Sequence, residues 1–170
     1  LEDILHKGAD FTERCHYSYD VMGNKVMAEK ERPGLPEDSG SFSYCYDALN
    51  RLTTVAQNGQ TLRTYSYDAF GNRSSKTEYQ TAGGLVTTYR YNTRNQLLRE
   101  TNANGTKDYA YDHRGNLLSV TSGKEVLRAY GFDAANQMNS SMGMTDGQIK
   151  KAVYQYNGLG HRMEQSIAAV

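Results

Sequence analysis

The distribution of tyrosine constrains this 170-residue chain most, because thirteen of its fourteen tyrosines fall in one short motif written seven times. The motif begins with two aromatic residues separated by one variable residue, at Tyr17, Tyr44, Tyr65, Tyr89, Tyr109, Tyr130 and Tyr154. The second aromatic residues are 27, 21, 24, 20, 21 and 24 positions apart. A motif that recurs at such a period indicates a repeat protein, in which each copy is one structural unit.

The aromatic residues at the first and third motif positions point to one face of an extended strand, since side chains alternate along a strand. The third position holds Tyr19, Tyr46, Tyr67, Tyr91, Tyr111, Phe132 and Tyr156. Tyrosine combines an apolar ring with a hydroxyl group that prefers a partner, which suits a sheet surface that is only partly dried. We therefore expect a strand that ends at the second aromatic residue of each motif.

The next positions predict a turn. The fourth position holds Asp20, Asp47, Asp68, Asn92, Asp112, Asp133 and Asn157, whose side chains can accept a hydrogen bond from the amide two residues on. The seventh position holds residues that tolerate a positive φ, namely Gly23, Asn50, Gly71, Asn95, Gly115, Asn136 and Gly160. Gly and Asn alternate strictly there, which indicates a unit of two hairpins. One interpretation is that successive turns meet different neighbours.

A second class of turn lies between the motifs, at Asn58-Gly59, Gly83-Gly84, Asn104-Gly105, Ser122-Gly123 and Asp146-Gly147. The segment 31–41 carries both prolines and predicts an exposed loop. The strands that these turns delimit include 51–57, 61–67, 74–81, 85–91, 96–101, 107–111, 116–121, 125–132 and 149–156. No segment shows an apolar stripe of helical period, so the sequence predicts an all-β antiparallel meander of about two strands per motif.

Composition excludes several classes of function. Nineteen basic and nineteen acidic residues give zero formal charge, which argues against a nucleic-acid partner. The chain has no long apolar run and a mean hydropathy of −0.75, so we expect no membrane insertion. Cys15 shares a strand face with Tyr19, whereas Cys45 faces the other way, so we expect no disulfide between them.

No set of residues has the spacing of a catalytic or metal site. The four histidines are scattered, and no nucleophile has a base placed beside it, so we expect no enzyme, no metal and no cofactor. Calcium is the alternative for the repeated aspartates, but each motif supplies one carboxylate where calcium needs six to eight oxygens. We favour turn formation for these residues.

The stretch Tyr65 to Arg73, which reads YSYDAFGNR, resembles the YD repeat of the RHS family. That family includes bacterial polymorphic toxins, insecticidal toxin-complex C components, wall-associated proteins and teneurins. The resemblance implies a curved open sheet that forms part of a spiral β-shell, and in the bacterial toxins the shell encloses a C-terminal toxic domain. The family's protease segment has no counterpart in this sequence, so the resemblance does not extend protease or toxin activity to this chain.

Together these observations predict one YD-repeat segment over residues 1–170, a fragment of a longer shell with seven motifs from Tyr17 to Arg162. The expected partners are the rest of the parent shell and its C-terminal cargo, with self-association through open sheet edges. The resemblance implies a secreted or cell-surface location. The alternative is an adhesion module that binds a glycan or a protein through its tyrosine-rich sheet.

Overall fold

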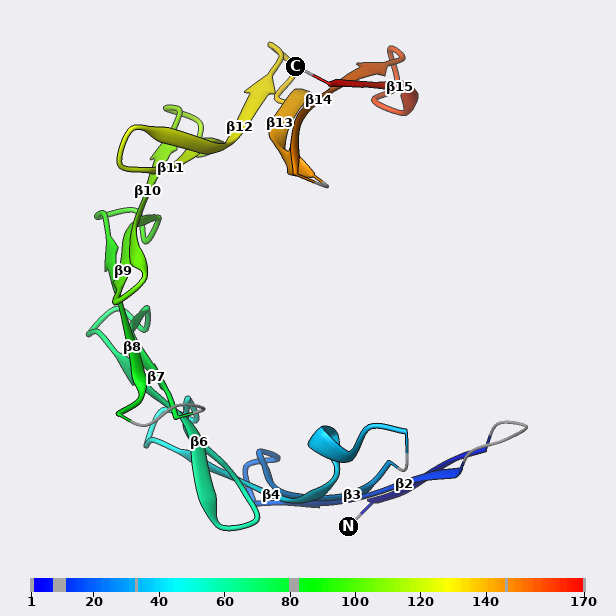
Figure 1. Cartoon of the computed structure of the whole chain (residues 1–170), viewed down its shortest axis with the longest axis vertical. Helices are drawn as coiled ribbons and strands as arrows, with labels where there is room; N and C mark the ends of the chain where they lie inside the picture. The colour runs from blue at the N-terminus through cyan, green and yellow to red at the C-terminus, as the bar shows by residue number, and fades with distance from the viewer. Residues whose placement is uncertain (1, 8–11, 33, 80–82, 146, 170) are drawn as a thin grey trace. The chain divides into compact units, whose positions relative to one another are not determined.

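The computed structural model describes residues 2–7, 12–32, 34–79, 83–145 and 147–169 (Figure 1). Its elements are fifteen β-strands and one short 3-10 helix. The first eight strands are β1 (Glu2–Lys7), β2 (Thr12–Tyr19), β3 (Lys25–Glu31), β4 (Gly40–Tyr46), β5 (Leu52–Gln57), β6 (Gln60–Tyr67), β7 (Arg73–Glu78) and β8 (Leu85–Tyr91). The others are β9 (Leu97–Asn102), β10 (Gly105–Tyr111), β11 (Leu117–Ser122), β12 (Glu125–Phe132), β13 (Met138–Thr145), β14 (Gln148–Tyr156) and β15 (Arg162–Ala169).

The strands follow one another in the sheet in the order of the sequence, and the pairings are antiparallel. The prediction of an all-β antiparallel meander is therefore confirmed. The chain divides into two compact units, Leu1–Thr87 and Thr88–Val170, each made of consecutive hairpins. Every motif supplies the second half of one strand, a turn and the start of the next strand.

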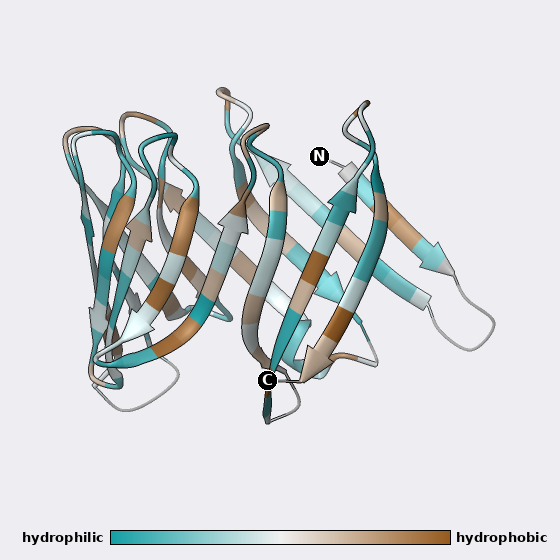
Figure 2. Ribbon diagram, turned by 90° about the horizontal axis from the view of Figure 1, so that it is seen from above, coloured by the Kyte–Doolittle hydropathy of each residue, from teal (hydrophilic) through white to brown (hydrophobic). Residues whose placement is uncertain are grey.

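The sheet of each unit has little hydrophobic core. In the described residues the buried apolar side chains are those of Cys15, Ala28, Phe42, Val55, Val120 and Ala152. Polar and apolar residues are mixed along the strands (Figure 2). Burial of apolar area is the main favourable term in most folds, so other interactions carry an unusually large share of the stability here.

The surroundings of Ala28 show that aromatic side chains form part of the small core. Ala28 on β3 is directly opposite Tyr17 on β2 and Phe42 on β4, and it is 0% exposed. The small side chain lets the two rings cover it from both sides. Buried residues thus lie on the face that carries the motif tyrosines.

A β-bulge recurs in every motif, and the sequence pattern did not reveal it. The register shifts between the second and third motif positions in all seven hairpins. The unpaired residue lies on the returning strand, at Val26, Thr53, Ser74, Leu98, Leu118, Asn139 and Met163. A bulge increases the local twist of a hairpin, so each motif introduces the same bend into its strand pair.

The observed strands match the expected segments to within a few residues, with three differences. The first strand, β1, precedes the first motif and was not anticipated. The segment 31–41 includes the end of β3 and the start of β4, and it contains the 3-10 helix Pro36–Asp38. The strand expected over 74–81 ends at Glu78, and its last two residues lie outside the described residues, as does Asp146 of one expected turn.

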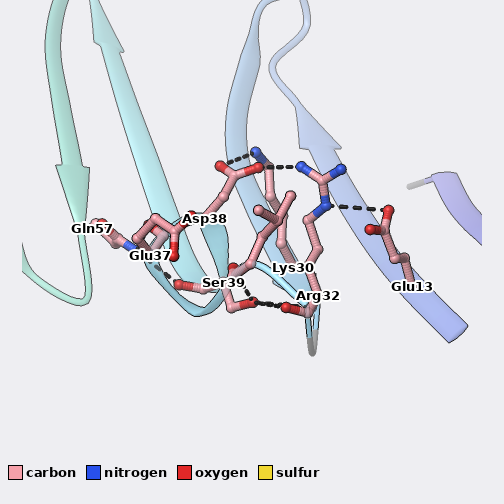
Figure 3. A network of polar contacts seen from close by, with 8 residues as sticks. Glu13, Lys30, Arg32, Glu37, Asp38, Ser39 and Gln57 are labelled. Carbon is pink, nitrogen blue, oxygen red and sulfur yellow. Dashed lines mark hydrogen bonds and ion pairs between the residues drawn. The ribbon is translucent and has the colours of Figure 1, made fainter. Parts of the chain in front are cut away.

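A polar network fixes the connection between β3 and β4 (Figure 3). Asp38 accepts a hydrogen bond from Lys30 Nζ at 2.9 Å and another from Arg32, whose Nε lies 3.2 Å from Glu13 Oε2. The Lys30 ammonium and then the Arg32 guanidinium lower the pKa of Asp38. Gln57 Nε2 donates to the carbonyl oxygen of Ser39 at 2.7 Å. The loop is exposed at its tip but anchored at its base.

The position of Ala28 allows a test of packing on the tyrosine face. We expect Ala28→Leu to lower the free energy of unfolding by about 1–3 kcal/mol, because the added atoms displace the flanking rings. The control is Ala110→Leu, which lies between two motif tyrosines on the opposite, exposed face and should change it by less than about 0.5 kcal/mol. Urea unfolding followed by circular dichroism measures both, and equal midpoints for the two variants would contradict this view of the core.

Candidate functional site: the tyrosine face and the turn edge

The motif residues lie in two places. The aromatic residues at the first and third motif positions lie on one face of the sheet, which we call the tyrosine face. The motif turns form the second place, which we call the turn edge. The turn edge comprises residues 20–25, 47–52, 68–73, 92–97, 112–117, 133–138 and 157–162. Each turn begins where a tyrosine strand ends, so the motif places the same set of side chains at the end of every hairpin.

The side chain at the fourth motif position closes each turn. Asp112 Oδ1 accepts hydrogen bonds from the amides of Arg114 and Asn116, both at 2.9 Å. The main chain adds a bond from the Gly115 amide to the Asp112 carbonyl oxygen at 3.1 Å. The same pair of side-chain bonds forms at Asp20, Asp47, Asp68, Asn92 and Asn157, and Asp133 accepts from the Gln137 amide.

The residue at the seventh position has a left-handed backbone in every turn. The φ angles are 83° at Gly23, 59° at Asn50, 86° at Gly71, 59° at Asn95, 96° at Gly115, 65° at Asn136 and 81° at Gly160. Glycine and asparagine are the residues that adopt this conformation at least cost. Backbone conformation alone therefore explains the choice of these two types, but not their alternation.

The first contact between successive turns involves the eighth position. Asn116 Nδ2 donates one hydrogen bond to its own Asp112 Oδ2 at 2.9 Å and a second to Asn136 Oδ1, in the next turn, at 2.5 Å. Asn24 makes the equivalent pair with Asp20 and with Asn50, both at 2.9 Å. We call a turn glycine-type or asparagine-type after its seventh residue. In these two glycine-type turns the eighth residue uses both amide hydrogens, one internally and one on the following asparagine-type turn.

The second contact runs from an asparagine-type turn to the following glycine-type turn. Its eighth residue is longer, either Arg51, Gln96 or Gln137. A Cβ atom built on Gly160 would lie 2.9 Å from Gln137 Nε2, and one on Gly115 would lie 3.3 Å from Gln96 Nε2. In these two cases the glutamine side chain occupies the space that a side chain at the next seventh position would need.

The second aromatic residue links hairpins through its hydroxyl group. Tyr46 donates to the Lys25 carbonyl oxygen at 2.8 Å, and Tyr67 donates to that of Leu52 at 2.7 Å. Tyr156 donates to the Met138 carbonyl oxygen at 2.8 Å. Each acceptor belongs to the ninth motif position of the preceding hairpin, so the tyrosine ties its own strand to the previous turn.

Cationic side chains cover several tyrosine rings. Lys25 Nζ lies 5.4 Å from the ring centroid of Tyr17 and 4.7 Å from that of Tyr44. The Arg51 guanidinium lies 4.6 Å from the centroid of Tyr67. Arg73 and Arg162 lie 5.8 and 5.5 Å from the rings of Tyr65 and Tyr154. Such cation–π contacts stabilise the rings in their places along the sheet.

Two of the first-position tyrosines are held in the neutral form. A hydrogen bond with Cys15 and burial raise the pKa of Tyr17 to about 12. Burial and the Glu100 carboxylate, which lies 3.1 Å from the Tyr109 hydroxyl, raise the pKa of Tyr109 to about 12. A phenol with such a pKa is a hydrogen-bond donor at neutral pH, not a nucleophile or a general base.

The described residues bring no group of three His, Cys, Asp or Glu side chains close enough to hold a metal ion. Both cysteines are free thiols, and Cys15 is buried whereas Cys45 is exposed. His16 pairs with Asp3 at 2.7 Å across β1 and β2. No helix in the described ranges is long and apolar enough to span a membrane.

A concavity of about 700 Å³ lies within the second unit, on strands β10 to β14. Its lining includes Tyr109, Val120, Val126, Arg128 and Met142. The repeat motif contributes only Tyr109 to this lining, and the Tyr109 hydroxyl group donates to Glu100.

The residues that sequence analysis missed are those at the eighth and ninth positions. The signal was present, since the eighth position reads Asn, Arg, Asn, Gln, Asn, Gln and His through the seven motifs. Its short and long side chains alternate in step with Gly and Asn at the seventh position until His161. In the structure, residues at both positions take part in the contacts between neighbouring turns.

Comparison with known proteins places this geometry in context. The family model described as Teneurin YD-shell matches residues 11–167. A tRNA3(Ser)-specific nuclease WapA of Bacillus spizizenii is 34% identical over 151 residues, which cover 85% of this chain and 6% of that protein. Teneurin-4 of Mus musculus is 30% identical over 145 residues, which cover 85% of this chain and 5% of that protein. The chain therefore spans a small part of the relatives it matches.

Solved structures share the fold. The crystal structure of TcdB2-TccC3 without its hypervariable C-terminal region superposes with a TM-score of 0.66, covering 95% of this chain and 9% of that one. The Tc holotoxin pore of Photorhabdus luminescens superposes with a TM-score of 0.65, with the same two coverages. Sequence identity is 15% in both cases, so the likeness is one of fold.

The aspartate turns should weaken in acid while the asparagine turns persist. Hydrogen bonds from Asn116 and from backbone amides lower the pKa of Asp112, so the stability that this carboxylate adds is present above about pH 4 and is lost as pH falls through its folded pKa. Asn92 makes the same backbone bonds and does not titrate. Amide exchange measured by NMR between pH 5 and 2.5 should show faster relative exchange at Arg114 than at Arg94, after correction for intrinsic rates. An equal change at both amides would contradict the role of the carboxylate.

The tyrosine hydroxyl should contribute a measurable cross-hairpin bond. We expect Tyr67→Phe to lower the free energy of unfolding by about 0.5–1.5 kcal/mol, because the Leu52 carbonyl oxygen loses its donor. Tyr79, which lies outside the motifs and is 46% exposed, provides the matched control as Tyr79→Phe. The prediction fails if both variants unfold at the wild-type urea midpoint.

Proposed function

This chain belongs to the teneurin YD-shell family, and from that premise we propose that it is a non-catalytic wall segment of a β-shell that encloses or presents a polypeptide. The match covers residues 11–167, which include all seven motifs, and the resemblance of the motif to the YD repeat is confirmed. The proposed partners are the remainder of the shell and a C-terminal polypeptide cargo, with a secreted toxin as the cargo we favour. We place the chain in a secreted or cell-surface protein.

The observation that carries this proposal is the internal use of the motif's polar groups. The fourth-position oxygens accept amides of their own turn, and the hydroxyl groups of Tyr46, Tyr67 and Tyr156 bind backbone carbonyl groups. These groups are therefore committed to closing turns and to joining hairpins. A binding or catalytic site would instead present convergent polar groups to a ligand.

The relatives support a role as a shell segment, but they do not indicate that this chain has an enzymatic activity. The WapA proteins are described as tRNA nucleases, yet this chain corresponds to 5–7% of the length of its curated relatives. This chain, which matches that small part, is an antiparallel sheet built of turns and tyrosines. We assign the nuclease activity of those proteins to regions outside the matched segment.

An adhesion module that binds a glycan or a protein through its tyrosines is the alternative. Glycan recognition by aromatic residues requires an open ring face. In the first unit, Lys25 and Arg51 lie over rings of the tyrosine face. This arrangement favours an architectural role for these rings.

The wall proposal predicts that the purified chain neither cleaves tRNA nor binds glycans. We expect intact tRNA on denaturing gels after incubation with the chain, and no signal on a glycan array at micromolar concentration. Glycan binding that disappears in Tyr65→Ala and persists in Tyr79→Ala would instead support the adhesion module. Cleavage of tRNA by the pure chain would contradict a non-catalytic role.

The enclosing role can be tested in a full-length protein that carries this segment. We expect Tyr67→Ala, which removes both the Leu52 bond and the Arg51 contact, to increase protease cleavage of the C-terminal polypeptide. Tyr79→Ala is the control and should leave cleavage unchanged. Equal cleavage in both variants, with Tyr67→Ala shown to disturb its hairpin, would count against enclosure.

A further inference from the structure

Backbone pairing alone specifies the order and register of these hairpins weakly. Register is strongly fixed where one sheet face is buried, because a one-residue slip moves every apolar side chain to the wrong face. In the described residues of this chain few side chains are buried, and polar residues occur on both faces. Another feature must therefore distinguish one hairpin's neighbour from another.

We infer that the turn edge supplies this distinction through two alternating side-chain contacts, so that a turn of one type accepts only a turn of the other type after it. The contact-determining residues are those at the seventh and eighth motif positions. Recognition of this kind between hairpins does not depend on what the assembled sheet encloses.

The step from a glycine-type turn to an asparagine-type turn needs a donor and an acceptor. Asn116 has one amide hydrogen on Asp112 and offers the other to Asn136 Oδ1. Asn24 and Asn50 repeat this arrangement in the first unit. A glycine in place of Asn136 would leave that amide hydrogen of Asn116 without its acceptor.

The step from an asparagine-type turn to a glycine-type turn needs space. Gln137 Nε2 lies where a Cβ atom of residue 160 would come within 2.9 Å, and Gln96 approaches residue 115 in the same way. In the first unit Arg51 takes a different route, since its Nη1 donates to the Asp68 carbonyl oxygen at 3.4 Å and leaves the space at Gly71 open. The long eighth side chain thus reaches the next turn in each case, and in two cases it excludes a side chain at the seventh position.

The two contacts explain why the types alternate. An asparagine-type turn placed after Gln96 or Gln137 would bring a side chain against that glutamine, whereas two successive glycine-type turns would leave an amide donor unused. Both mismatches cost stability, one by overlap and one by loss of a hydrogen bond. The partner that fits the turns with these contacts is therefore a YD hairpin of the opposite type.

The first experiment is Asn136→Gly, because the local and the cross-turn accounts predict opposite signs. Residue 136 has a φ of 65°, so glycine relieves backbone strain and a purely local account expects equal or slower amide exchange in the turn. Loss of the bond from Asn116 should instead make exchange at the Asn116 and Gln137 amides about threefold to tenfold faster. In an Asn116→Ala background the same substitution should no longer accelerate exchange.

The second experiment tests the space requirement with a matched pair of glycines. Gly160 and Gly23 have φ angles of 81° and 83°, but only Gly160 has a neighbour in the way of a Cβ atom. Alanine at either position carries the same backbone strain, so turn amides should exchange at least about threefold faster in Gly160→Ala than in Gly23→Ala, relative to wild type. Gln137→Ala should abolish that difference.

Local amide exchange keeps both tests informative even if a variant loses global stability. Acceleration that depends on Asn116 in the first experiment and on Gln137 in the second supports the inference. Slower or unchanged exchange in Asn136→Gly overturns the donor–acceptor contact. Equal effects of the two alanine substitutions, or a difference that persists after Gln137→Ala, overturn the space requirement.

Discussion

The hydrogen bond that closes each turn is the interaction on which the rest of the structure depends. A carboxylate or amide oxygen at the fourth motif position holds the backbone amides of the turn, as Asp112 does with Arg114 and Asn116. The closed turn then positions the eighth residue and the neighbouring tyrosine. Because the described residues bury few apolar side chains, the loss of these polar contacts would not be compensated by a large hydrophobic core.

From the turns upward, the structure is a series of equivalent connections between hairpins. Tyrosine hydroxyl groups reach the preceding turn, as Tyr67 reaches Leu52, and cations such as Lys25 fill the gaps between rings. Stability in such a repeat comes from nearest-neighbour terms and can extend over any number of copies. That property suits a segment of an extended shell better than a compact domain built around one site.

Sequence reasoning recovered the hairpins because their signals are local. The spacing of Tyr65, Tyr67 and Asp68 specifies a strand and a turn without reference to any other part of the chain. The bulge opposite the second aromatic residue was missed, since it depends on pairing geometry and falls on residues as different as Val26 and Ser74. The strand β1 was missed because no motif precedes it. The alternation of Gly and Asn was visible in the sequence, but its cause lies in contacts between residues about 20 positions apart, such as Asn116 and Asn136.

The most direct test of the dominance of the turn edge is residue-resolved amide exchange across the whole chain. Several described strands run from a motif turn at one end to a plain turn such as Asn58-Gly59 at the other, so the chain supplies its own comparison. The structure predicts that main-chain amides bonded within the motif turns, such as those of Asp112 and Asn116, exchange more slowly than amides beside the plain turns. Protection that is uniform along the strands, or greatest at the plain turns, would contradict the central role of the motif.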